Sequence, residues 1–328
     1  MEETLSKIAR MGLSRRGFIA GAGTATVAAL AGCGSDSANT GTGTTTPPTT
    51  TPAVTLTDSD ILNFALNLEY LEAEFYLRAV TGAGIASTDG GGTVTGGTKV
   101  TFATPFIQQL AVELAASELA HVRAIRATIS SLGGTVVAAP AIDFTNAFNA
   151  LASAAGIGSS FNPFADQNSF LLGAAVFEDV GVTAYTGAAA LLTSKTVLSA
   201  AAGIQATEAY HAATVRSLIA YNNTTANNLV ATFNKVVTLR GQLGGSGSTT
   251  YETPLSAGSA TAAVALNGPV TNVTPATIVA ADSTNSLAFA RTTSQVLHIV
   301  YATAPGTLTA SGGFFPAGMN GTIKTPTA

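Results

Sequence analysis

The sequence has one cysteine and few charged side chains, and each scarcity excludes a class of protein. The single cysteine, Cys33, cannot form an intramolecular disulfide, so the fold must be stable without one. Only 10% of the 328 residues are charged, the formal net charge is −4, and the Lys and Arg residues are scattered along the chain. Nucleic acid selects basic surfaces and is therefore not an expected partner. The 46% hydrophobic share, much of it alanine, instead favours closely packed helices.

Residues 1–33 have the pattern of an export signal. Arg15 and Arg16 precede a weakly apolar segment, which ends in Leu30-Ala31-Gly32-Cys33, a lipobox. The apolar run of about 15 residues is shorter than the roughly 20 residues that a membrane-spanning helix needs. We therefore predict export by the twin-arginine pathway, removal of the signal and lipidation of Cys33. The mature protein would then be anchored to a membrane and face the periplasm or the cell exterior.

The rest of the chain divides by composition into three parts. Residues 34–55 are Gly, Ser, Thr and Pro, which predicts a flexible linker. Residues 56–243 carry helical periodicity, and residues 244–328 form a Gly- and Thr-rich accessory region with strand-like patterns. The four long helices are expected over 58–81, 105–132, 167–192 and 195–222, with shorter helical segments at 143–155, 226–243 and 284–301. A long crossover over 133–166 separates the two helix pairs, and residues 82–104 are expected to form an irregular loop or a short hairpin.

The two helix pairs carry the same arrangement of polar residues. Each has a glutamate followed seven residues later by a tyrosine, and then a Glu-x-x-His sequence on the next helix. The two copies are Glu69, Tyr76, Glu118 and His121, and Glu178, Tyr185, Glu208 and His211. Residues three apart on a helix share one face, so each Glu-x-x-His sequence directs a carboxylate and an imidazole to the same point. We therefore predict that the two copies meet in the core of the bundle.

Four carboxylates inside an apolar bundle require compensating positive charge. Together with two neutral imidazoles they supply a charge of about −4, which two divalent cations would neutralise. The mixed oxygen and nitrogen ligands suit iron or manganese better than zinc. The residues thus predict a dinuclear metal site.

These motifs resemble those of the ferritin-like di-iron carboxylate proteins, in particular exported ferritin-like-domain proteins related to the plant desiccation-associated group. The resemblance covers about residues 55–225 and extends to FFPAGMNG near the C-terminus. It implies a mainly α fold, a ferritin-like four-helix bundle with one long crossover. It also implies terminal ligands Glu69 and Glu178, bridging ligands Glu118 and Glu208, and one histidine for each metal, His121 and His211.

Several alternatives remain open at this stage. Glu72 lies on nearly the same helix face as Glu69 and could replace or supplement it as a ligand. Tyr76 and Tyr185 are candidate catalytic residues that orient ligands or relay electrons, but buried tyrosines are as often packing residues. His298 has no glutamate three residues before it and is expected to be a structural or surface histidine rather than a ligand.

Other charged residues are predicted to lie outside the site. Three arginines are assigned to the surface of the bundle, namely Arg123, Arg126 and Arg216. Three acidic residues are expected to be solvated or to support the ligands from outside, namely Glu74, Glu113 and Asp179.

The leading functional hypothesis is an iron-handling or metal-dependent oxidoreductase that uses O2 or peroxide, with ferroxidase or peroxide-consuming chemistry. Twin-arginine export carries folded proteins, which agrees with metal loading inside the cell. A closed storage cage is disfavoured because each subunit would carry an anchor and a tether. The alternative is a structural or stress-protective lipoprotein whose metal only stabilises the fold. The sequence does not decide whether the protein turns over a substrate, or whether it forms a homodimer.

Overall fold

The computed structural model describes residues 55–245, 251–256, 259–260, 273–274 and 277–327. The predicted signal, the lipobox with Cys33 and nearly all of the predicted linker lie outside these residues and stay predictions. Residues 54–328 make one compact unit. Across the part of the chain that the structure describes, every helix is too short or too polar to span a lipid bilayer.

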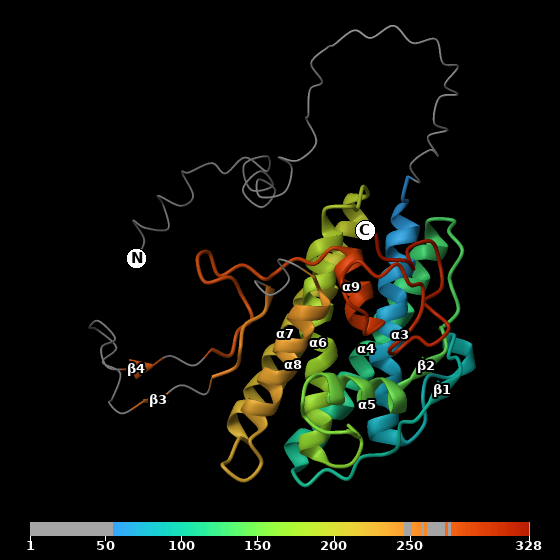
Figure 1. Cartoon of the computed structure of the whole chain (residues 1–328). Helices are drawn as coiled ribbons and strands as arrows, with labels where there is room; N and C mark the ends of the chain where they lie inside the picture. The colour runs from blue at the N-terminus through green and yellow to red at the C-terminus, as the bar shows by residue number, and fades with distance from the viewer. Residues whose placement is uncertain (1–54, 246–250, 257–258, 261–272, 275–276, 328) are drawn as a thin grey trace, which may run out of the picture. The chain divides into compact units, whose positions relative to one another are not determined.

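Four long helices form a bundle and confirm the predicted helical fold (Figure 1). They are α3 (Asp58–Thr81), α4 (Pro105–Ser131), α6 (Gln167–Ala189) and α7 (Lys195–Tyr221). Each begins at the predicted residue and ends within three residues of the predicted end. Helix α3 packs along α4, and α6 packs along α7, so the bundle consists of two antiparallel pairs joined by the long crossover.

Local capping explains where these helices begin and end. Thr57 caps α3, and its side chain and that of Asp60 form a reciprocal capping box. Gly82 ends α3 with a φ of 84°, a left-handed conformation that suits glycine. Asp58 is the first residue of α3, and its Oδ1 and Oδ2 accept hydrogen bonds from the backbone N–H groups of Thr193 and Ser194. Asp58 therefore ties the start of α3 to the loop between α6 and α7.

The shorter elements differ more from the prediction. They are α5 (Phe144–Ala154), α8 (Leu229–Leu243), α9 (Thr293–Val300), the 3-10 turn η1 (Ser87–Asp89), β1 (Val94–Thr95), β2 (Ile142–Asp143), β3 (Ser259–Ala260) and β4 (Val273–Thr274). Strand β1 pairs in parallel with β2 of the crossover, and β3 pairs antiparallel with β4. The hairpin considered for residues 82–104 is therefore not formed, because the partner of β1 is 48 residues further along the chain.

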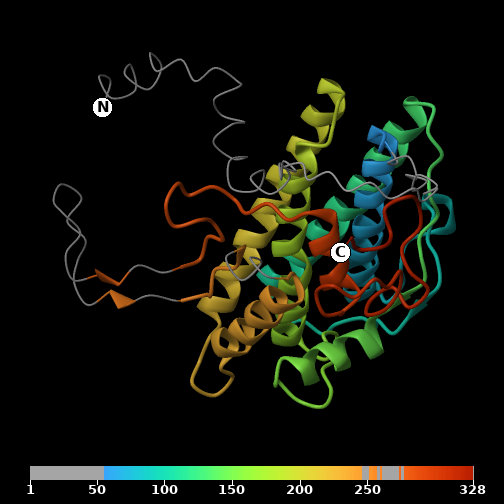
Figure 2. The ribbon, with the colours of Figure 1, turned by 45° about the horizontal axis from the view of Figure 1, so that its top comes forward.

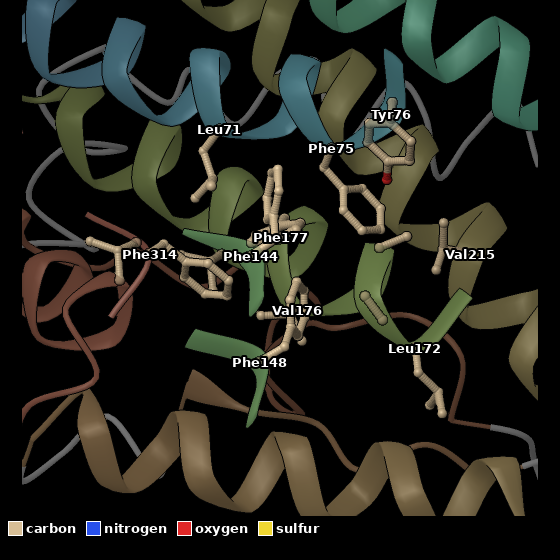
Figure 3. Packing of buried hydrophobic residues seen from close by; sticks show 14 of the residues in the cluster. Leu71, Phe75, Tyr76, Phe144, Phe148, Leu172, Val176, Phe177, Val215 and Phe314 are labelled. Atoms are coloured by element: carbon tan, nitrogen blue, oxygen red, sulfur yellow. The ribbon is translucent and has the colours of Figure 1, made fainter. Parts of the chain in front are cut away.

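The C-terminal segment is part of the core. Phe314 and Phe315 are buried, and Phe314 packs edge-on against Phe148 and Phe177 with ring centroids 5.1 and 5.0 Å apart (Figure 3). Asn320 and Asn67 of α3 exchange hydrogen bonds of 2.9 Å between side chain and backbone. Helix α9 and the segment after it lie over the bundle beside α3 and α6 (Figure 2). The FFPAGMNG sequence thus closes one side of the bundle.

A buried ionic network joins the second helix pair to the C-terminal half of the chain. Asp179 of α6 accepts hydrogen bonds from Arg216 of α7 at 2.9 Å and from Arg240 of α8 at 2.8 Å. Glu252 pairs with Arg240 and Arg291. Burial alone would raise the pKa of Asp179, but Arg240 and Arg216 hold it below its usual value. The prediction that Arg216 is a surface charge is wrong. Asp179, which was expected to be solvated or to support the ligands from outside, is buried and paired with arginines of α7 and α8.

Removing Arg216 should destabilise the fold strongly. Its guanidinium also donates to the backbone oxygens of Ile278 and Thr253, so Arg216→Ala leaves the buried Asp179 with Arg240 as its remaining arginine partner and removes the donor of both carbonyls. We expect a loss of about 3 to 5 kcal/mol in the free energy of unfolding, measured by urea denaturation.

Arg123→Ala is the matched control, because Arg123 forms an exposed ion pair with Asp89. It should leave the unfolding midpoint nearly unchanged. Equal effects of the two substitutions would mean that the buried network does not stabilise the fold.

Candidate metal centre

The six predicted ligands meet inside the bundle in two groups of potential donor atoms. The first group is Glu69, Glu118, His121 and Glu208, and the second is Glu118, Glu178 and His211. Within each group the donor atoms lie within 4.8 Å of one another, and every residue is buried. Glu118 belongs to both groups, whereas Glu208 belongs only to the first. The structure therefore brings together all six residues from the four long helices.

The two histidines approach the carboxylates through the same ring nitrogen. His121 Nδ1 lies 3.2 Å from Glu118 Oε2, 3.2 Å from Glu208 Oε1 and 3.3 Å from Glu69 Oε2. His211 Nδ1 lies 2.8 Å from Glu118 Oε1 and 3.6 Å from Glu178 Oε2. The rings are roughly parallel, with centroids 6.1 Å apart. One imidazole thus belongs to each donor group.

The two tyrosines connect the helix pairs reciprocally. The Tyr76 hydroxyl of α3 donates to Glu178 Oε1 of α6, and the Tyr185 hydroxyl of α6 donates to Glu69 Oε1 of α3. Each tyrosine thereby leaves the second oxygen of its glutamate facing the cluster. This geometry supports the predicted orienting role, because a fixed carboxylate presents a defined donor atom.

The unpaired polar atoms at this site fit a cation. Six buried atoms of the cluster have no hydrogen-bond partner among the described residues: Glu69 Oε2, Glu118 Oε1, Glu178 Oε2, Glu208 Oε1, Glu208 Oε2 and His211 Nδ1. The 2.8 Å approach of His211 Nδ1 to Glu118 Oε1 does not have hydrogen-bond geometry. Buried polar atoms are normally satisfied, and oxygen and imidazole donors are the ligands of iron and manganese. The cluster therefore could bind metal.

Without metal the cluster retains protons. Burial is the largest cause that raises the pKa of Glu118 and of Glu208 to about 8. Neighbouring carboxylates add to this rise in pKa, whereas His121 opposes it. Burial and then Glu208 raise the pKa of Glu178 well above its usual range. Burial lowers the pKa of His211, whereas in His121 hydrogen bonds to carboxylates outweigh burial and raise the pKa. Divalent cations would replace these protons as the compensating charge.

A fifth carboxylate, Glu72, lies beside the cluster. Glu69 contributes a donor atom to the first group, whereas Glu72 belongs to neither. A Cβ built on Gly181 would be 2.6 Å from Glu208 Oε2 and 3.3 Å from Glu72 Oε1, so Glu72 and Glu208 face the same glycine. Burial and then Glu208 raise the pKa of Glu72 well above its usual range. The spacing of Glu69 and Glu72 signalled this position, but nothing in the sequence singled out Gly181.

The remaining candidates lie outside the cluster. His298 is buried on α9, with Nδ1 3.2 Å from the Thr303 hydroxyl, which agrees with its predicted structural role. Glu113 is exposed, as predicted. Glu74 was expected to be solvated or to support the ligands, but it is buried, forms an ion pair with Arg78 and accepts the N–H of Ile85.

Replacing either cluster tyrosine with phenylalanine should weaken metal binding. Tyr76→Phe or Tyr185→Phe removes the hydroxyl that orients a glutamate, and we expect metal affinity to fall about 10- to 100-fold, measured by competition with a chelator. Tyr301→Phe is the control, because its buried hydroxyl donates to the Lys324 carbonyl, away from the cluster. An affinity unchanged by all three substitutions would contradict the orienting role.

Comparison with known proteins finds a matching family and two similar proteins. A family model described as a ferritin-like domain matches residues 57–221, which include all six cluster residues. Desiccation-related protein PCC13-62 of Craterostigma plantagineum is 33% identical over 202 residues, covering 58% of this chain and 64% of that protein. Ferritin-like catalase Nec2 of Nesocodon mauritianus is 28% identical over 287 residues, covering 83% of this chain and 86% of that protein.

Proposed function

The chain belongs to the family of ferritin-like domains, and we propose that it is a dinuclear iron or manganese enzyme that converts hydrogen peroxide to water and dioxygen. Two redox-active ions would exchange two electrons with peroxide, so that one peroxide molecule is reduced to water and a second is oxidised to dioxygen. The relative that is named a catalase supports this choice because its match extends over 83% of the chain. The reaction requires no further reductant.

The observation that carries the proposal is the sharing of Glu118 between two buried donor groups with unpaired atoms. A carboxylate with one oxygen toward each group is suited to hold two ions close together. Glu69, His121 and Glu208 would complete one ion, and Glu178 and His211 the other. A purely structural polar core would instead be expected to pair these atoms with one another.

The protein's own residues would prepare the site for this reaction. The Tyr76 and Tyr185 hydroxyls hold Glu178 and Glu69 in fixed orientations. Glu72, which retains a proton because of burial, provides a carboxyl group beside Glu208 that can hold or release a proton at Oε1. The apolar core around the cluster keeps bulk water away and strengthens these electrostatic interactions.

The second candidate function is non-catalytic protection. It is favoured by the 33% identity to a protein named desiccation-related. In this alternative the bound ions stabilise the bundle, since a ligand that binds only the folded state raises its stability. Turnover of peroxide separates the two functions.

The test is metal analysis and peroxide turnover of the full-length chain produced with added manganese or iron. We expect about two ions per chain and dioxygen evolution from hydrogen peroxide, recorded with an oxygen electrode. The zinc-loaded protein is the control, because zinc has no redox chemistry and should give no dioxygen. Two bound manganese or iron ions without dioxygen evolution would rule out the enzyme and leave the protective role.

A further inference from the structure

Two neighbouring pockets lie on the side of the bundle that α9 and the C-terminal segment cover. The outer pocket is bordered by α5, α6 and α8, with Leu151, Leu172 and Val236 among its walls. The inner pocket is bordered by α3 and α6, with Leu71 and Val180 among its walls. Three residues line both pockets, namely Val176, Ile299 and Phe314. The two pockets therefore adjoin at these three side chains, and Figure 3 shows Val176 next to Phe148 of the outer wall.

The walls of both pockets are almost entirely hydrocarbon. Among the described residues that line them, only Thr232, Arg240 and Glu72 carry polar side-chain atoms. Each guanidinium nitrogen of Arg240 already donates a hydrogen bond, to Glu252, to the Ala175 carbonyl or to Asp179. Arg240 therefore offers little to a polar ligand. A polar molecule would lose its hydrogen bonds to water here, whereas apolar cavities take up small apolar molecules.

The inner end of the inner pocket reaches the metal-binding cluster. Gly181 and Glu72 line this pocket, and a Cβ on Gly181 would come within 2.6 Å of Glu208 Oε2. Because Gly181 lacks a side chain, Glu208 Oε2 lies close against the backbone at Gly181, which lines the pocket. The two pockets thus extend from the outer side of α5 and α8 to Gly181, which lies against Glu208 of the first donor group.

We propose that these pockets form a passage for dioxygen between the cluster and solvent, with Val176, Ile299 and Phe314 as its neck. Dioxygen is small and apolar, which matches the lining, whereas hydrogen peroxide carries hydrogen-bonding groups that the lining cannot satisfy. The proposal rests on the proposed function because dioxygen is the product of that reaction. Rotation of the neck side chains would let a molecule pass, since buried side chains change rotamer within a packed core.

The passage can be tested without any turnover. Dissolved dioxygen is paramagnetic and speeds the relaxation of methyl protons that it contacts. We would record this effect on the full-length chain purified without added metal and labelled at Ile, Leu and Val methyl groups. Methyls of Val176 and Ile299, which are 9% and 4% exposed, should be affected several-fold more than those of Val182 and Leu62, which are 8% and 6% exposed and line neither pocket. Equal effects on the four residues would overturn the passage.

A variant tests the neck. Val176→Phe places a larger side chain where the pockets adjoin, and the dioxygen effect should be lost at Leu71 of the inner pocket but kept at Leu151 of the outer pocket. Val112→Phe is the control, because Val112 is exposed on α4 and should leave both effects intact. An effect at Leu71 that survives in Val176→Phe would exclude these residues as the neck. If Val176→Phe does not fold, the comparison of the four methyl groups in the unmodified chain still decides.

Failure of the passage and failure of the proposed function give different results. Dioxygen evolution by the manganese-loaded protein with uniform methyl relaxation would remove the passage and keep the enzyme. Selective methyl relaxation without dioxygen evolution would keep an apolar gas site and remove the peroxide reaction.

Discussion

Replacing Glu118 with alanine should abolish the binding of both metal ions. Glu118 is the only residue shared by the two donor groups among the described residues, so its removal takes a ligand from each ion. Loss of a partner that merely orients a ligand costs about 10- to 100-fold in affinity, and loss of a shared ligand should cost more. We expect the metal content of the purified full-length chain to fall from about two ions to near zero, with no dioxygen evolution.

Glu113→Ala is the matched control for this experiment. Glu113 lies on the same helix, α4, but is exposed, so the variant should keep its metal and its activity. Circular dichroism of both variants should show unchanged helicity, because Glu118→Ala reduces the number of buried carboxylate atoms that lack a partner in the metal-free cluster. Full metal occupancy in folded Glu118→Ala would exclude the shared-ligand arrangement.

Glu208→Ala tests whether Glu208 is a ligand of one ion or of both. The resemblance to di-iron proteins implies that Glu208 bridges, whereas in the structure its oxygens belong to the first donor group alone. If that arrangement persists with metal bound, Glu208→Ala should lose one ion and keep the ion held by Glu118, Glu178 and His211. Loss of both ions would instead support a bridging Glu208.

The parts of the site that the sequence predicts are those that depend on helical spacing. Glu118 and His121 are three residues apart on a helix, and this spacing alone sets their common direction. The long helices could be located because the alanine-rich periodic segments have clear boundary residues, such as Pro105 at the start of α4 and Gly82 after the end of α3. The crossed pairing of Tyr76 with Glu178 could not be predicted, since it depends on how α3 and α6 face each other.

Features that depend on distant segments were missed for the same reason. Arg216 resembles a surface residue in its own helix, and only Asp179 and the backbone around Thr253 and Ile278 make its burial favourable. The partner of β1 lies in the crossover, and the two strands pair over only two residues each, which is too short for a periodic pattern in the sequence. The role of Gly181 becomes visible only when Glu72 and Glu208 are placed beside it.

The metal-free protein should lose stability as the pH rises from 6.5 to 8.5. The pKa values of Glu118 and Glu208 are raised from 4.5 to about 8 in the folded state, chiefly by burial. In this range the folded chain holds protons that the unfolded chain has released, so the unfolding free energy falls with pH. His121, whose pKa is also raised, acts in the same direction. His211 acts in the opposite direction only below 6.5, because its folded-state pKa is lowered.

The size of this effect follows from proton linkage. Each carboxyl contributes about 1.4 kcal/mol per pH unit while the pH lies between its two pKa values. The two glutamates together therefore give a loss on the order of 4 kcal/mol by pH 8, which corresponds to a fall of roughly 10 °C in the melting temperature. Differential scanning calorimetry of the chelator-treated protein at several pH values measures it.

Metal should reverse this pH dependence. Deprotonated carboxylates and neutral imidazoles bind divalent cations more tightly, so manganese should stabilise the protein more at pH 8 than at pH 6.5. The double variant Glu118→Gln, Glu208→Gln preserves the side-chain shapes but cannot titrate at these two positions, so its melting temperature should change less with pH than that of the wild-type protein and little with manganese. A metal-free wild-type protein whose stability is flat between pH 6.5 and 8.5 would mean that the buried glutamates are already ionised and compensated without metal, which would remove the charge argument for two bound cations.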